Sequence, residues 1–147
     1  MGMVVDVDSL DDMCAMMCDN QLPQRKMKRI VPDRIYRGLP CSVVAVGCAL
    51  GIGSSDALRA LYSDSMHRDG YLSLNGMNAL VRKNMKVIRR TNYRRGERPC
   101  LRDFCHGFDG KAIVCVSGHF VYVDNGNYHS FFRNGDDDVI AVWEIDS

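Results

Sequence analysis

The spacing of hydrophobic and polar positions changes near Lys111, and the change divides the chain into a helical part and a strand part. Before Lys111, apolar residues recur three or four positions apart or form one continuous run, which favours helices. The expected elements there are helices at 8–18, 41–50, 56–66, from Ser73 onward and at 100–106, with a short strand at 86–90. The expected strands after it are 112–116, 119–124, 128–132 and 139–145. Helices followed by an antiparallel sheet indicate an α+β fold.

The longest apolar run, residues 41–50, follows Pro40 and ends at Gly51. Periodicity alone does not separate a buried strand from a buried helix in such a run. Its length, its small residues on several faces and its glycine stop favour a central buried helix. We therefore expect a helix that begins within two residues of Cys41 and packs against the C-terminal sheet.

A tight hairpin is expected at residues 124–127, where Asp-Asn-Gly-Asn separates two strand patterns. The type I′ turn matches the twist of paired strands, and it needs residues that tolerate positive φ. The sequence therefore predicts positive φ at Asn125 and Gly126.

The 147 residues suggest one domain, 1–147, with an N-terminal helix and basic arm at 1–32 and a core at 33–147. A formal net charge of +1 argues against bulk electrostatic binding of nucleic acid, although Lys and Arg concentrate at 24–37 and 82–102. No apolar run reaches the roughly 18 residues that cross a bilayer, so membrane insertion is not expected. The oligomeric state is not indicated.

The seven cysteines are irregularly spaced, and no secretory signal is recognisable at residues 1–10. Reduced thiols in the cytoplasm are the simplest interpretation. Five positions could supply zinc ligands: Cys14, Cys18, Cys100, Cys105 and His106. These positions contain no CxxC pair and do not match common structural zinc sites, so we expect neither a metal nor a cofactor.

Cys41 and His119 form the constellation best suited to chemistry. A cysteine at a helix N-terminus meets free backbone N–H groups, which lower a thiol pKa and can hold an oxyanion. His119 follows Gly118 at the first position of a strand, where it can face a helix packed on the sheet. We expect Cys41 to be the reactive thiol and to lie within reach of His119. Polar residues that could orient the imidazole follow one hairpin later, at His129, Ser130, Asn134 and Asp136.

This order of a helix-opening Cys, two further helices, a strand, a helix and then Gly-His-Phe-Val-Tyr-Val-Asp-Asn-Gly is shared with a known group of enzymes. Residues 33–145 resemble the papain-like cysteine peptidase superfamily, especially the small C39-type bacteriocin-processing peptidases and related bacteriophage proteins. The resemblance implies that Cys41 is the nucleophile and His119 the base. It also implies that Asn134 or Asp136 orients the imidazole, with Asn134 preferred because it ends the return strand. A phage or bacterial processing role on a peptide or protein substrate follows from the resemblance.

The chain departs from the superfamily at two positions. These enzymes usually carry an oxyanion-binding Gln about six residues before the Cys, and here that position is Ile35. Arg34, Tyr36 or Arg37 could substitute for it. The residue after Cys41 is Ser42, where many relatives have Gly. The backbone N–H of Ser42 and the side chain of Arg37 are therefore the expected oxyanion donors.

Two functions follow from these observations. The first is a cysteine peptidase or amidase in which Tyr36 and Gly118 contact the substrate. The second is a catalytically inactive papain-like fold that binds a protein or nucleic acid through its cleft or its basic segment 89–102. The missing glutamine favours the second function, whereas the pairing of Cys41 with His119 favours the first.

Overall fold

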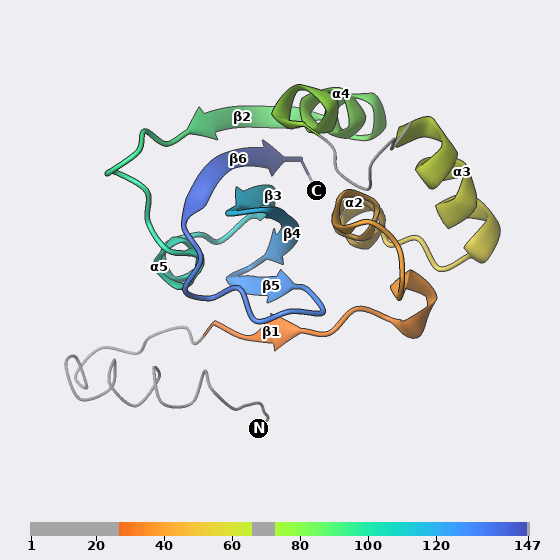
Figure 1. Ribbon diagram of the computed structural model, residues 1–147, viewed down its shortest axis with the longest axis horizontal. Coiled ribbons are helices and arrows are strands. Elements are labelled where there is room, and N and C mark those ends of the chain that lie inside the picture. The colour runs from red at the N-terminus through yellow and green to blue at the C-terminus, as the bar shows by residue number, and fades with distance from the viewer. Residues whose placement is uncertain (1–26, 66–72, 147) are drawn as a thin grey trace.

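A computed structural model describes residues 27–65 and 73–146 of the chain (Figure 1). The helix expected at 8–18 lies outside the described residues. The elements, in chain order, are β1 (Arg29–Ile30), the 3-10 helix η1 (Arg34–Tyr36), α2 (Cys41–Leu50), α3 (Ser55–Ser65), α4 (Leu74–Asn84), β2 (Val87–Asn92), α5 (Leu101–His106), β3 (Lys111–Val116), β4 (His119–Asp124), β5 (Asn127–His129) and β6 (Val139–Ile145). None of the helices within these two ranges is long and apolar enough to cross a membrane.

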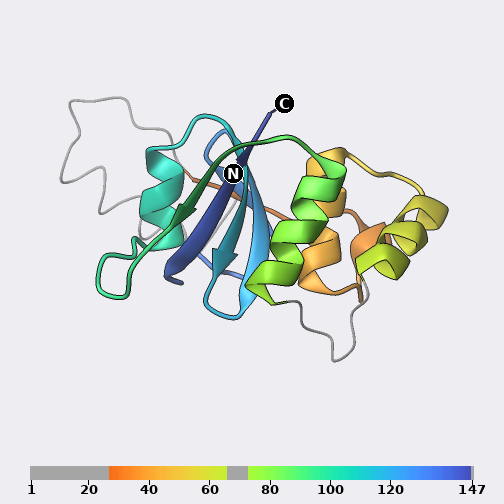
Figure 2. The same cartoon turned by 90° about the horizontal axis from the view of Figure 1, so that it is seen from above.

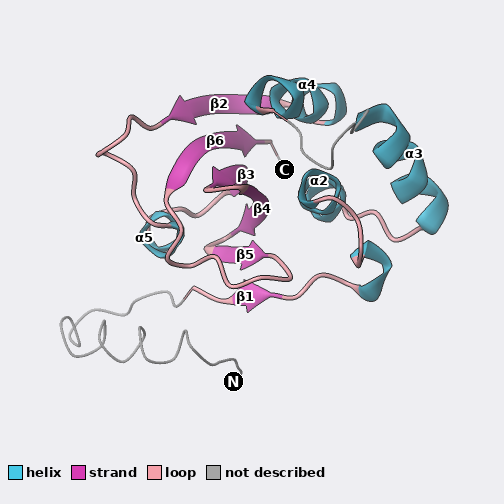
Figure 3. Ribbon diagram, viewed as in Figure 1, coloured by secondary structure: helices cyan, strands magenta, loops and turns pink. Residues whose placement is uncertain are grey.

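The strands form one six-stranded mixed sheet in the order β1-β5-β4-β3-β6-β2, and the class is α+β as expected (Figure 3). The sheet is not wholly antiparallel, because β1 pairs with β5 in parallel register. A two-residue strand is too short to show an alternating pattern. The sequence therefore predicts only the basic arm at these residues. The expected core boundary at residue 33 is also wrong, since Met27 is buried and β1 joins the sheet.

Alternating side chains of the central strands build two separate cores. Ile113 and Cys115 of β3 pack on the α2 side. The alternate residues of the same strand pack with α5, namely Ala112, Val114 and Val116 against Leu101 and Cys105. Figure 2 shows α2, α3 and α4 on one side of the sheet and α5 on the other. Burial on both faces explains why β3 is almost continuously apolar rather than alternating.

Helix α2 begins at Cys41, as the sequence predicts, directly after Pro40. It ends at Gly51, whose φ of 69° is the left-handed conformation that glycine adopts at helix ends. Residues 42–47 are all buried. The Tyr36 hydroxyl secures this helix, because it donates to the Gly47 carbonyl at 3.1 Å and also contacts the carbonyl of Ile52.

The hairpin between β4 and β5 has the expected conformation. Asp124 pairs with Asn127, and φ is 53° at Asn125 and 83° at Gly126. Both signs are those of a type I′ turn, which confirms the prediction. Strand β5 ends at His129 instead of continuing to Phe132. The polar residues after it therefore lie on a loop rather than on a strand.

Candidate active site

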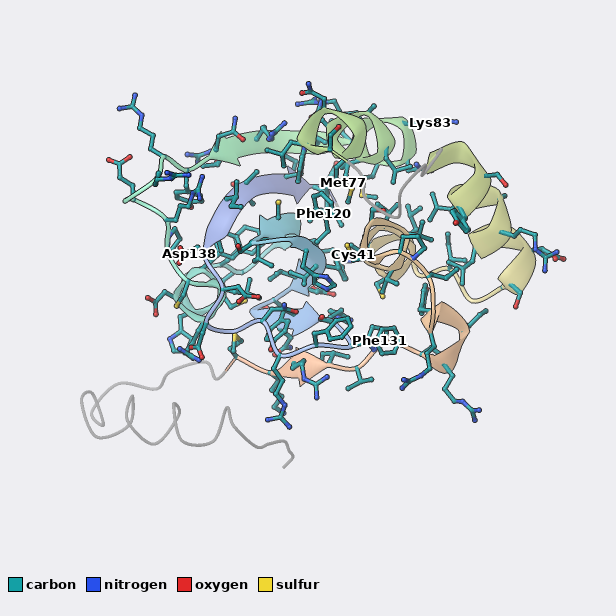
Figure 4. All side chains as sticks on the ribbon, viewed as in Figure 1. Cys41, Met77, Lys83, Phe120, Phe131 and Asp138 are labelled. Atoms are coloured by element: carbon teal, nitrogen blue, oxygen red, sulfur yellow. The ribbon has the colours of Figure 1, made fainter. Side chains whose placement is uncertain are left out.

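Cys41 lies where the N-terminus of α2 meets the first residues of β4. Figure 4 shows it between the helix and the sheet, close to Phe120. The backbone N–H groups of Phe120, Ser42 and Cys41 favour the thiolate form of Cys41 and act to lower its pKa. Packing of a buried helix on a buried strand thus surrounds one partly exposed thiol with N–H donors from both elements.

Burial raises the pKa of the Cys41 thiol, and the three N–H donors oppose this effect without cancelling it. The lowered pKa expected from the helix N-terminus is therefore not what the structure shows. Burial penalises the thiolate by removing it from water, and this penalty outweighs the donors. At Cys48, Cys105 and Cys115, burial is again the largest cause and raises the pKa to about 11, 12 and 11.

His119 opens β4, and its ring contacts the loop that follows β5. Its Nε2 lies 3.3 Å from Ser130 Oγ, and the ring meets Phe132 edge-on with 5.4 Å between centroids. Burial lowers the pKa of His119, and the negative charge of Asp137 opposes this shift in part. The imidazole is therefore neutral at neutral pH and able to accept a proton.

A chain of hydrogen bonds extends from Ser130 into the protein. Ser130 Oγ donates to Asn134 Oδ1 at 2.8 Å, and Asn134 Nδ2 donates to Asp137 Oδ2 at 2.8 Å. The backbone N–H of Asn134 donates to the Tyr128 hydroxyl at 3.1 Å. Ser130 and Asn134 are both buried, so these bonds hold the loop in one arrangement.

These hydrogen bonds determine which ring nitrogen of His119 carries the proton. The single hydroxyl hydrogen of Ser130 is donated to Asn134, so Ser130 Oγ has only acceptor positions left for its other partners. It accepts from the backbone N–H of Phe132 at 3.0 Å and therefore also from His119 Nε2–H. The proton then resides on Nε2, and Nδ1 carries the lone pair that can act as a base.

The candidate orienting residues differ in their distance from the imidazole. Ser130 contacts the ring, whereas Asn134 reaches it only through Ser130. Asp136 is exposed and its carboxylate bonds to Arg102 at 2.6 Å. His129 contacts the Tyr122 ring, with 4.9 Å between centroids. Ser130 was one of four candidates from the sequence for orienting the imidazole, but Asn134 was preferred. Asp137 was not among the candidates.

The remaining candidates fall around the pocket or away from it. Tyr36 bonds to Gly47 and Ile52 toward the C-terminal end of α2, so it braces the helix. Arg37 stacks on Phe131, with its guanidinium carbon 5.0 Å from the ring centroid. Ser42 contributes a backbone N–H to the Cys41 sulfur, and Gly118 forms the turn before His119 with φ of 71°.

A small pocket of about 50 Å³ connects these groups. Its lining residues are Leu39, Cys41, Val44, His119, Phe120, His129, Ser130, Phe131 and Phe132. Cys41 and His119 therefore border one space, although no hydrogen bond joins the two side chains in the described part of the chain. The walls are mainly apolar, and their polar side chains are the Cys41 thiol, the Ser130 hydroxyl and the imidazoles of His119 and His129.

No family model, curated protein or solved structure matches this sequence. The function therefore has to be inferred from the chemistry of the pocket itself. Within residues 27–65 and 73–146, no three His, Cys, Asp or Glu side chains gather in a way that could hold a metal ion. The residues that line the pocket bring four polar side chains to it, those of Cys41, His119, His129 and Ser130.

Proposed function

We propose that this chain is a papain-like cysteine hydrolase that cleaves a peptide or amide bond, with Cys41 as nucleophile and His119 as base. One observation carries the proposal: Cys41 at a helix N-terminus and His119 at a strand start border one pocket, and N–H groups from both elements surround the sulfur. The order of these elements along the chain is also the order that the resemblance to papain-like peptidases implies.

The first chemical step is general-base catalysis rather than attack by a preformed thiolate. Burial keeps Cys41 as a thiol and His119 as a neutral imidazole at neutral pH. His119 Nδ1 takes the thiol proton as the sulfur attacks the substrate carbonyl carbon. The resulting imidazolium then gives this proton to the leaving amine, and water hydrolyses the thioester.

The backbone amides near Cys41 supply the stabilisation that the missing glutamine would give. The N–H groups of Cys41 and Ser42 belong to the first turn of α2, where backbone N–H groups have no acceptor within the helix. An oxyanion formed beside the sulfur meets these donors, whose dipoles are already oriented by the helix. The amides adjoin the sulfur, whereas the Arg37 guanidinium lies over the Phe131 ring, so we assign the oxyanion to the amides.

A thiol-reactive peptide electrophile tests the proposal. We expect brief treatment at pH 7 to modify Cys41 in preference to Cys48, Cys105 and Cys115, because only the Cys41 thiolate among these four has backbone donors that oppose burial. His119→Ala should slow this modification by about 100-fold, the usual contribution of a general base. Mass mapping of tryptic peptides identifies the site.

Cys100→Ser is the matched control, because Cys100 is partly exposed but caps α5 on the opposite side of the sheet. Its modification rate at Cys41 should equal that of the unaltered chain. An adduct on another thiol with Cys41 untouched would contradict the proposal, and so would an unchanged rate in His119→Ala.

A non-catalytic binding module is the second candidate, and specific observations favour it. Cys41 and His119 are not hydrogen-bonded, the Cys41 pKa is raised, and the residue that contacts His119 is a serine instead of an amide or carboxylate. In this alternative the pocket binds a partner peptide without cleaving it. Equal labelling of Cys41 with and without His119 would select this alternative.

A further inference from the structure

Two arginines contact residues that line the candidate pocket, and a third follows a lining residue in the sequence. Arg37 stacks on Phe131, and Arg29 Nη1 donates to the Ser130 carbonyl at 3.2 Å. Both contacted residues line the pocket. Arg133 is exposed and directly follows Phe132, another lining residue. We call Arg29, Arg37 and Arg133 the basic rim.

No carboxylate neutralises the basic rim in the described part of the chain. The ion pairs found there join Arg59 to Asp56, Arg89 to Glu144 and Arg102 to Asp136. The acids nearest in sequence to Arg133 are directed elsewhere, since Asp136 pairs with Arg102 and Asp137 accepts from Asn134. Figure 4 shows Asp138 well away from Cys41 and Phe131. Among the described residues, the three arginines of the basic rim therefore have no ion-pair partner and can pair with acidic groups of a ligand.

The surface between the rim and Cys41 is apolar. Phe132 is 62% exposed, although it borders a pocket and contacts His119. Leu39 and Phe131 continue this apolar wall. A ligand that fits both features needs an apolar side chain beside acidic groups.

We propose that the ligand of this surface is an acidic peptide, whose apolar side chain packs on Phe132 while carboxylates meet Arg37 and Arg29. Its status as a substrate rests on the proposed hydrolase function, whereas its binding does not. The interaction places opposite charges at the edge of an interface, where they steer association and discriminate between partners. A basic peptide of the same shape is repelled.

A single-stranded nucleic acid is the other polyanion to consider, and the pocket disfavours it. Such ligands bind by stacking successive bases on aromatic faces. One face of Phe131 is covered by Arg37, and its ring also packs against the α2-side core.

Fluorescence anisotropy with three labelled peptides tests the inference. Each peptide has a central Leu, flanked by Glu, Ser or Lys, and the protein carries Cys41→Ser to prevent turnover. We expect the Glu peptide to bind roughly fivefold tighter than the Ser peptide, the scale of one exposed ion pair. Arg37→Glu should remove this preference and Arg133→Glu should reduce it. Arg94→Glu should preserve it, because Arg94 lies on the β2–α5 loop at the opposite end of the molecule from η1 (Figure 1).

The outcomes separate this inference from the proposed function. Equal binding of all three peptides, or a preference that survives Arg37→Glu, overturns the acidic-peptide inference. Tighter binding of a thymidine oligonucleotide than of the Glu peptide overturns it as well. Glu-peptide selectivity in Cys41→Ser supports it, even if the unaltered chain cleaves none of the peptides. That absence of cleavage would count against the hydrolase alone.

Discussion

At the scale of single residues, the contact between His119 and Ser130 has two separate effects. The Ser130 hydroxyl holds the ring and assigns the proton to Nε2, because its own hydrogen is donated to Asn134. A hydroxyl carries no charge, however, so it does not raise the His119 pKa as an adjacent carboxylate would. The negative charge of Asp137 raises the His119 pKa, but Asn134 and Ser130 separate this carboxylate from the ring. Burial therefore remains the largest influence on the pKa.

The lowered His119 pKa predicts that the domain loses stability in mild acid. A histidine whose folded pKa lies below its unfolded value of about 6.5 leaves stability intact above that pH. Stability then falls as the pH drops from about 6.5 toward the folded pKa, because the unfolded chain binds the proton more readily. Burial lowers the pKa of His129 in the same direction. Urea unfolding at pH 7.5 and 5.0 measures the loss.

Replacing His119 with Gln should make this acid-induced loss of stability smaller. His106→Gln is the control, since His106 lies in the last turn of α5, on the other side of the sheet from the helices α2, α3 and α4. The control should retain the full loss. An identical pH dependence in the original chain and in His119→Gln would show that His119 does not contribute.

At the scale of secondary-structure elements, α2 depends on the close approach of Tyr36 to Gly47. A Cβ added at Gly47 would lie 2.7 Å from Tyr36 Cε1 and 3.0 Å from Leu58 Cδ2. The Tyr36 ring cannot easily move, because its hydroxyl bonds to the Gly47 and Ile52 carbonyls. We therefore expect overpacking to outweigh the helix propensity of alanine.

Gly47→Ala should lower the free energy of unfolding by about 1–3 kcal/mol, the usual cost of overpacking. Helix propensity alone would instead raise it by about 1 kcal/mol, so the sign of the change decides between the two effects. Gly107→Ala is the control, because its φ is −99° and no atom lies within 4 Å of an added Cβ. Chemical denaturation of both variants measures the difference, and a more stable Gly47→Ala would refute the expectation.

The β4–β5 hairpin depends on the left-handed conformation of its turn. Gly126 has a φ of 83°, which is strained for a β-branched residue. Gly126→Val should destabilise the domain by about 1 kcal/mol or more. Gly53→Val serves for comparison, because Gly53 has open space around an added Cβ and is not among the positive-φ glycines. Equal melting temperatures for the two variants would contradict the expected strain.

At the scale of the whole molecule, the segment before residue 33 completes the sheet. Met27 is 3% exposed and packs in the α5-side core, and β1 supplies the edge strand next to β5. The same strand carries Arg29, which reaches the Ser130 carbonyl beside the pocket. This segment thus contributes to the core and to the rim of the candidate site.

Met27→Ala should therefore destabilise the domain by about 2–5 kcal/mol, the range for truncating a buried methionine. A core that began at residue 33 would be insensitive to the change. Val31→Ala is the comparison, because Val31 is 51% exposed on the same segment. Thermal unfolding should show a large decrease in melting temperature only for Met27→Ala. Similar melting temperatures for the two variants would support a core that begins at residue 33.

Local pattern by itself determined the elements that place the pocket. The apolar run after Pro40 predicted that α2 begins at Cys41, and the residues of β4 and of its type I′ turn were assigned correctly. These features depend on neighbouring residues, through burial periodicity and the φ preferences of glycine and asparagine.

Only the tertiary structure decided which polar side chain meets His119, which sign the Cys41 pKa shift takes and where the core begins. The loop after β5 offers several polar groups at similar sequence distance, and packing alone brings Ser130 to the ring and turns Asp136 toward Arg102. The Cys41 pKa depends on how much of the sulfur is covered by residues far away in sequence. The parallel pairing of β1 with β5 joins segments about a hundred residues apart. A two-residue strand shows no alternation of apolar and polar residues from which it could be predicted.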